Sequence, residues 1–240
     1  MKDVFKDAKP ILCNTDMVRG ILEGRKTSDR RIVKLKYDNT HHEMFTNKYG
    51  TRLIEIQNDV EGETYGKNED GTTWRRLRGY IEPVPPYKKG DILYVRETFC
   101  PNYFNESLAG YRKGMRGNRN AYKADYHKEV IGDYVPEPKW IPSIHMSKEA
   151  ARLFLKVTDV RAERLQSMPH DGPLKEGVHY CECPDGFTWK SQTDMEHCYT
   201  TPMGAMKALW DSKIKKKDHD RYGWNADPWV WVIEFQRIGL

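Results

Sequence analysis

The chain has 240 residues, of which 38% are hydrophobic and 31% charged, so it can bury one sizeable core and we expect a single domain over residues 1–240. The mean hydropathy is −0.84 and no apolar run reaches the length of a membrane span, which excludes a helical membrane protein and a membrane partner. Residues 1–6 lack the apolar segment of a signal peptide, so we expect a cytoplasmic protein. The formal net charge of +5 favours acidic partners such as nucleic acids.

Residues 14–24 show the pattern of a short amphipathic helix. Asn14 or Thr15 is suited to the N-cap position, and Gly24 is suited to the position just after the helix. The apolar face consists of Met17, Val18, Ile21 and Leu22.

Directly after this helix, residues 24–31 carry four cations and one carboxylate. Positive charge is favoured at a helix C-terminus by the helix dipole. The segment is therefore either a solvated basic turn or a fixed contact for an anion or a nucleotide. In the second interpretation the binding side chains are those of Arg25, Lys26, Thr27, Ser28, Arg30 and Arg31.

The rest of the chain shows mainly strand patterns, with few helices. We expect strands over residues 11–13, 32–37, 52–60, 74–81, 92–97, 153–157 and 228–235, and helical segments over 147–151, 165–177 and 201–213. The remaining long segments are expected as loops: 38–50, the hairpin tip 61–71, the basic surface excursion 101–145 and the cysteine-rich segment 179–198.

The predicted strand 74–81 carries cations between aromatic residues. Trp74 and Arg76 would lie on its exposed side, an arrangement suited to stacking on bases and binding phosphates. The alternative is an ordinary amphipathic surface hairpin. Residues 52–60 are the expected partner strand in both interpretations.

Three of the five cysteines lie near two histidines. Such a group can hold a structural zinc ion, although the spacing Cys-x-Cys differs from the usual Cys-x2-Cys. The alternative is free thiols on a loop and no cofactor at all. The candidate ligands are His179, Cys181, Cys183, His197 and Cys198.

Short strands, few helices and an apolar strand near each end predict an α+β fold, mainly β: a small closed barrel with flanking short helices and long insertions. The patterns Gly24-x-Lys26-x-x-Asp29-x-Arg31 and Gly90-Asp91-x-Leu93-x-Val95, followed by a hydrophobic final strand, resemble the ASCH domain. ASCH domains are a branch of the PUA-like barrels, which bind RNA or modified nucleotides.

Residues 153–177 and the tryptophan-rich segment 224–231 resemble the ASCH proteins of bacteriophages and prophages. The resemblance implies a protein that acts in the cytoplasm of a bacterial host cell. It also implies a barrel core over about residues 9–37, 84–100 and 146–240, with insertions over about 38–83 and 101–145.

ASCH proteins are thought to place a lysine and a carboxylate in a cleft beside the barrel. A small bacterial member of the family removes the acetyl group of N4-acetylcytidine, and its lysine and glutamate fall on Lys26 and Glu176. Its nucleophilic threonine falls on Asp29, which would instead pair with Lys26. The resemblance thus implies Lys26, Asp29 and Glu176 as catalytic residues, with Thr27 or Ser28 as the source of a hydroxyl.

Lys26 can act as a general base only if its pKa falls by roughly 3 units. Asp29 and Glu176 oppose such a fall, so we expect a charged Lys26 that holds a phosphate or a base carbonyl while Glu176 accepts from an exocyclic amine. An ion-pair network that only ties the turn to the later segment is the structural alternative.

Three functions follow, in order of preference. The first is a binding protein for RNA, single-stranded DNA or a modified nucleoside. The second is a hydrolase, either an amidohydrolase of acylated nucleosides or a ribonuclease. The third is an accessory protein in phage assembly or host takeover that acts through protein contacts.

Overall fold

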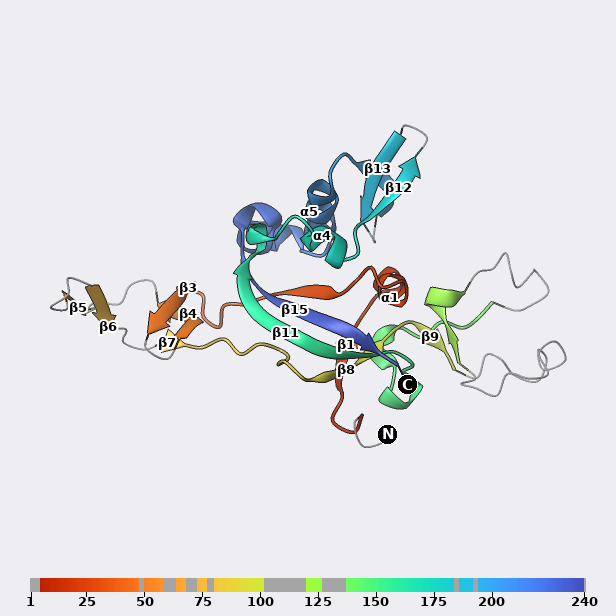
Figure 1. Cartoon of the computed structure of the whole chain (residues 1–240), viewed down its shortest axis with the longest axis horizontal. Coiled ribbons are helices and arrows are strands. Elements are labelled where there is room, and N and C mark those ends of the chain that lie inside the picture. The colour runs from red at the N-terminus through yellow and green to blue at the C-terminus, as the bar shows by residue number, and fades with distance from the viewer. Residues whose placement is uncertain are drawn as a thin grey trace.

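The computed structural model describes residues 5–47, 50–57, 64–67, 73–76, 80–101, 120–126, 137–183, 186–191 and 194–239. It describes the backbone but not the side chains of 47, 57, 64–67, 73–76, 181–183, 186–188, 191 and 194–197. Within these limits the protein has an α+β fold, mainly β, with several sheets and few helices (Figure 1). No helix in the described part of the chain combines the length and the apolar character that a membrane crossing requires.

The strands are β1 (Lys9–Leu12), β2 (Ser28–Ile32), β3 (Thr40–Asn47), β4 (Gly50–Gln57), β5 (Thr64–Lys67), β6 (Thr73–Arg76), β7 (Tyr80–Ile81), β8 (Ile92–Arg96), β9 (Phe99–Cys100), β10 (Ala121–Tyr122), β11 (Phe154–Arg164), β12 (His179–Cys183), β13 (Gly186–Ser191), β14 (Asp194–Tyr199) and β15 (Trp229–Ile238). The α-helices are α1 (Thr15–Leu22), α4 (Gly172–Lys175), α5 (Pro202–Ser212) and α6 (His219–Tyr222). Single 3-10 turns are η1 (Lys123–Asp125), η2 (Ser143–His145), η3 (Lys148–Ala150), η4 (Leu165–Ser167), η5 (Lys216–Asp218) and η6 (Trp224–Ala226).

A five-stranded sheet of order β1-β8-β11-β15-β2 forms the centre of the molecule. β1 runs parallel to β8, and the other pairs are antiparallel. The long strands β11 and β15 pair along nearly their whole length, with a register shift between Val157 and Asp159. Such an irregularity adds local twist, and Figure 1 shows β11 and β15 strongly curved.

The prediction of a closed barrel is wrong for the described residues. β1 and β2 are the two edges of the sheet and do not pair with each other. The chain turns into α1 three residues after β1, and this helix packs Met17, Val18 and Ile21 into the same core as the sheet. The helix therefore shares the hydrophobic core of an open sheet.

The first helix has the ends that the sequence predicts. The Asn14 side chain accepts a hydrogen bond from the backbone N–H of Met17 at 2.8 Å, which satisfies one of the first amides of the helix. Gly24 follows the helix with a φ of +77°, a conformation that favours glycine.

β2 spans Ser28–Ile32 and therefore begins earlier in the chain than the predicted strand over residues 32–37. Its register is set by β15, against which Arg31 lies opposite Trp231. The alternation in residues 32–37 reflects real burial, since Val33 is buried and Lys34 and Lys36 are exposed. These residues form an extended connection and not a strand, so periodicity alone misplaced the element.

The first insertion also differs from the prediction. Residues 38–50 were expected as a loop, but Thr40–Asn47 form β3 and pair with β4. β7 pairs with β4 as expected, whereas β6, which contains Trp74, pairs with β5 inside the predicted hairpin tip. β3 carries few aliphatic residues, so its strand pattern is weak in the sequence.

A second layer lies above the main sheet in Figure 1 and contains α4, α5 and a β12–β13–β14 sheet. The cysteine-rich segment therefore forms three strands where a loop was predicted. A second core, with Leu165, Met206, Leu209 and Val232 among its members, joins this layer to the sheet. α5 agrees with the predicted helix, and Thr201 caps it by accepting from the N–H of Gly204. The predicted strands 92–97 and 228–235 are confirmed as β8 and β15, both inside the sheet.

Gly90 provides a test of the turn that leads into β8. Its φ is +92°, and a methyl group added there would meet no other atom within 4 Å, so only backbone strain opposes a side chain. We expect Gly90→Ala to lower the free energy of unfolding by about 1 kcal/mol. Gly239→Ala is the control, because that site is equally open and has no positive φ. Denaturant unfolding measures the stability of both variants. Equal stabilities would show that the positive φ at residue 90 does not oppose a side chain.

Candidate functional site

Two segments far apart in the sequence meet just below α4. The backbone N–H of Lys26 donates to the carbonyl of Gly20, which holds the turn after α1, and the N–H of Thr27 donates to the carbonyl of Lys175 at 2.9 Å. Lys175 is the last residue of α4, and Glu176 follows it. The backbone therefore places the side chain of Lys26 beside that of Glu176.

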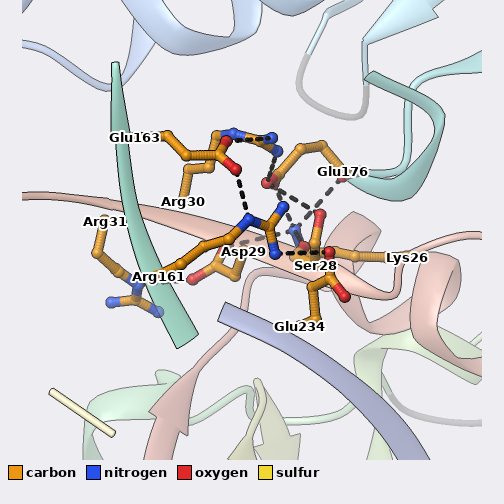
Figure 2. A network of polar contacts seen from close by, with 9 residues as sticks. All are labelled: Lys26, Ser28, Asp29, Arg30, Arg31, Arg161, Glu163, Glu176 and Glu234. Carbon is orange, nitrogen blue, oxygen red and sulfur yellow. Dashed lines mark hydrogen bonds and ion pairs between the residues drawn. The ribbon is translucent and has the colours of Figure 1, made fainter. Parts of the chain in front are cut away.

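The Lys26 ammonium group is buried and surrounded by oxygen atoms (Figure 2). Its Nζ lies 3.0 Å from Oε2 of Glu176 and 3.3 Å from Oδ1 of Asp29. It also donates to the backbone carbonyl of Ser28 at 2.6 Å. All three positions that an ammonium group can offer are thus directed at acceptors.

The Glu176 carboxylate accepts hydrogen bonds from three side chains. Its Oε2 receives Lys26, and its Oε1 accepts from Oγ of Ser28 at 3.2 Å and from a terminal nitrogen of Arg30 at 2.9 Å. Each of these side chains is at most 8% exposed. We refer to Lys26, Ser28, Asp29, Arg30 and Glu176 as the buried charge cluster.

Asp29 connects the cluster to the surface. Its Oδ2 accepts from Nε of Arg31 at 2.6 Å, while its Oδ1 faces Lys26. The Arg31 side chain is 38% exposed and the Asp29 side chain only 5%. A buried carboxylate therefore fixes an arginine whose side chain is partly exposed.

The electrostatics of the cluster keep both groups charged. Burial by itself would lower the pKa of Lys26, but Glu176 and then Asp29 outweigh it and raise this pKa above its usual value. Burial also works against ionisation of Asp29, but Lys26 and then Arg31 lower the pKa of Asp29 from 3.8 to about 2. A protonated Lys26 is a hydrogen-bond donor and not a general base, as the sequence analysis expects.

Lys213, which follows α5, is a further neighbour of the cluster and was not among the predicted site residues. Its side chain is accessible to solvent but is surrounded by protein on most sides. Desolvation lowers its pKa, the charge of Asp29 opposes this shift, and the charge of Lys26 adds to it. Its place at the end of a predicted helix carried no motif that would have identified it.

A set of charged residues on β11 and β15 borders the cluster (Figure 2). Arg161 is bonded to Asp159, Glu163 and Glu234, and Oε2 of Glu163 lies 3.9 Å from a terminal nitrogen of Arg30. Nε of Arg30 and Oε2 of Glu163 are buried and have no hydrogen-bond partner in the structure. In the sequence, the signal for this set was the alternation of charged residues at Asp159, Arg161 and Glu163, which places them on one face of a strand.

The other predicted binding residues lie outside the cluster. Arg25 pairs with Glu23 and donates to the carbonyl of Gly177, and Thr27 contributes its backbone to both neighbouring segments. The side chains of Trp74 and Arg76 lie outside the described residues.

The predicted zinc ligands are only partly described. Cys198 is disulfide-bonded, so its sulfur is not available to a metal as a thiolate. Nδ1 of His179 is buried without a partner, and the side chains of Cys181, Cys183 and His197 lie outside the described residues. Among the side chains that are described, no group of three or more His, Cys, Asp and Glu residues could hold a metal ion.

No family model, no curated protein and no solved structure matches this chain. What the site can bind therefore follows from its own side chains. Within the buried charge cluster the cations Lys26 and Arg30 balance the carboxylates Asp29 and Glu176. Arg31 and Lys213 add positive charge beside it, and the carboxylates around Arg161 add negative charge.

The lowered pKa of Asp29 predicts an acid-sensitive contribution to stability. Because the folded-state pKa lies below the usual value, the contribution is complete above pH 4 and is lost as the pH falls toward 2. We expect this loss to be about 2 kcal/mol. Denaturant unfolding between pH 5 and 2 measures it, and Asp29→Asn should flatten this part of the profile. A variant with the wild-type slope would show that another group is responsible.

Proposed function

We propose that this protein is a nucleotide-binding protein of the ASCH type, with a PUA-like core, and that its buried charge cluster holds RNA, single-stranded DNA or a modified nucleoside. The observation that carries the proposal is the 3.0 Å contact between Lys26 and Glu176, which lie 150 residues apart in the chain. Ser28 and Arg30 converge on the same carboxylate.

The residues of the ASCH-like pattern have the positions that such a site requires. Gly24 has the φ of +77° that lets the chain leave α1 toward Lys26. Asp91 accepts from Nζ of Lys9 at 2.6 Å and so joins the turn before β8 to β1. These contacts support a PUA-like core in which α1 connects the two edge strands of an open sheet.

The cluster offers the hydrogen-bond pattern that a nucleobase edge can use. Arg30 has a buried donor without a partner, Nε, and Glu163 has a buried acceptor without one, Oε2. A base that presents a carbonyl oxygen and an exocyclic amine on one edge, as cytosine does with O2 and N4 on either side of N3, can satisfy both atoms. The unsatisfied pair therefore favours a cytosine-like base.

Glu176→Gln tests the binding function. The change keeps the size of the side chain and removes its charge, so we expect cytidine monophosphate to bind about 10-fold to 100-fold more weakly. Asp171→Asn is the matched control, because Asp171 is an exposed carboxylate that pairs with Lys175 on the same short helix. Isothermal titration calorimetry measures the affinities, and thermal unfolding verifies that each variant is folded.

Equal affinity of Glu176→Gln and Asp171→Asn for the nucleotide would contradict the proposed site. Absence of nucleotide and oligonucleotide binding by the wild-type protein at low salt would contradict the function itself. Binding through phosphates should weaken steeply as salt is added.

One contact favours hydrolysis as a second candidate function. Oγ of Ser28 donates to Oε1 of Glu176 at 3.2 Å, which is the geometry of a hydroxyl nucleophile beside a base. In this reaction the Ser28 oxygen attacks the acetyl carbonyl while Glu176 accepts its proton and then returns it to the N4 amine, which leaves as cytidine. Water then hydrolyses the acetyl-serine, and Lys26 holds Glu176 in place throughout. Asp29 occupies the position of the family's threonine but is engaged by Lys26 and Arg31, so it does not serve as the nucleophile.

Ser28→Ala tests the hydrolase. We expect at least about a 100-fold loss of the rate of N4-acetylcytidine deacetylation, because the nucleophile is removed, with little change in the affinity for cytidine monophosphate. Single-turnover assays with excess protein measure the rate. Deacetylation that persists in Ser28→Ala would eliminate this mechanism, and no deacetylation by the wild-type protein would leave binding as the function.

A further inference from the structure

A cavity of about 540 Å³ lies in the neck of the molecule, where the main sheet joins the β3–β4–β7 sheet. Figure 1 shows the two connections that form the neck, one after β2 and one after β7. Both contribute to the walls, together with β4 and β15. The volume lies within the range of small-molecule binding sites. We refer to this space as the neck cavity.

The acidic residues of the neck cavity are already engaged. Glu55 is 3% exposed, and its carboxylate accepts from the backbone N–H groups of Lys36 and Tyr37 and from Oγ1 of Thr40. Glu82 pairs with Arg52. Neither carboxylate therefore neutralises the cations of the cavity wall.

Three cations remain for a ligand. Lys34 and Lys36 are exposed and make no ion pair with any residue that the structure describes. Arg31 lies in the wall, and Asp29 accepts from its Nε, which leaves its two terminal nitrogens as further donors. This arrangement suits the oxygens of a phosphate.

Apolar surface lies beside these cations. Trp231 is half-buried opposite Arg31 on β15, and it lines the cavity with Val84, which is 83% exposed. Tyr37, next to Lys36 in the chain, is 54% exposed, and Nζ of Lys36 lies 5.4 Å from the centre of its ring. Aromatic faces that alternate with cations are characteristic of proteins that bind single-stranded nucleic acid.

The neck cavity adjoins the buried charge cluster through one carboxylate. Asp29 contacts Lys26 with one oxygen and Arg31 with the other. The two sites are therefore adjacent and separated by the Asp29 carboxylate, which places them within reach of two linked nucleotides.

We propose that the neck cavity is a second nucleotide subsite, so that the ligand is a single strand of nucleic acid and not a free nucleoside; this inference rests on the proposed function. Arg31, Lys34 and Lys36 bind the phosphodiester, and the neighbouring base lies against Trp231. The buried charge cluster holds the adjoining nucleotide.

The experiment compares ligands of different length. Cytidine monophosphate and six-nucleotide RNA and DNA strands are titrated into the wild-type protein and into a Lys34→Ala, Lys36→Ala double variant. The matched control is Lys215→Ala, Lys216→Ala, which removes the same charge from exposed lysines outside the cavity wall. Both pairs of lysines are exposed, so each variant is expected to fold, and circular dichroism verifies this.

We expect the strands to bind the wild-type protein at least about tenfold more tightly than cytidine monophosphate does. The Lys34→Ala, Lys36→Ala variant should lose most of this advantage in affinity for the strands. The slope of log affinity against log salt concentration for strand binding should become shallower by about 1.4, since two phosphate contacts are removed. Its affinity for the monophosphate should stay within about twofold of the wild type. The control variant should retain most of the advantage.

Equal binding of strands and monophosphate by the wild-type protein would overturn the second subsite. Equal losses in the two double variants would also overturn it, because the effect would then be one of net charge alone. The proposed function fails separately, if Glu176→Gln leaves the monophosphate affinity unchanged. If neither ligand binds, both fail. Comparison of the affinities for the RNA and DNA strands shows whether the 2′-hydroxyl group contributes to binding.

Discussion

The structure depends on a single buried carboxylate. Glu176 lies at 2% exposure with Lys26, Ser28 and Arg30 around it, and each of these residues comes from the segment after α1. A carboxylate in such a place is tolerated only when charge and hydrogen bonds compensate for lost hydration. Removal of one partner therefore costs far more than loss of a surface ion pair, since it leaves the others buried and uncompensated.

This carboxylate also joins the two layers of the protein. The main sheet and α1 share one hydrophobic core, and α5 and its neighbours share a second one with β15. Glu176 lies at the boundary, where the backbone of Thr27 donates to Lys175 and accepts from Phe235. The polar side chains of the site are thus held by both cores, which fixes their geometry without a rigid loop.

The sequence predicted the parts of the site that depend on local pattern. The α1 cap at Asn14, the turn at Gly24 and the proximity of Lys26 to Glu176 followed from spacing and from the ASCH resemblance. The carboxylates around Arg161 and the approach of Lys213 depend on which strands become neighbours, and no local signal specifies that. The prediction of a closed barrel was wrong for the same reason, since β1 and β2 remain the two edges of an open sheet.

The segment beyond the neck is independent of the main sheet in its strand pairing. The strands β3, β4 and β7 pair among themselves and not with the main sheet, so the segment between β2 and β8 behaves as an attachment to a completed scaffold. Only short connections carry it, and they border the ligand-sized space. Changes in this attachment leave the interior carboxylate and its partners untouched, because none of them lies in the segment between β2 and β8.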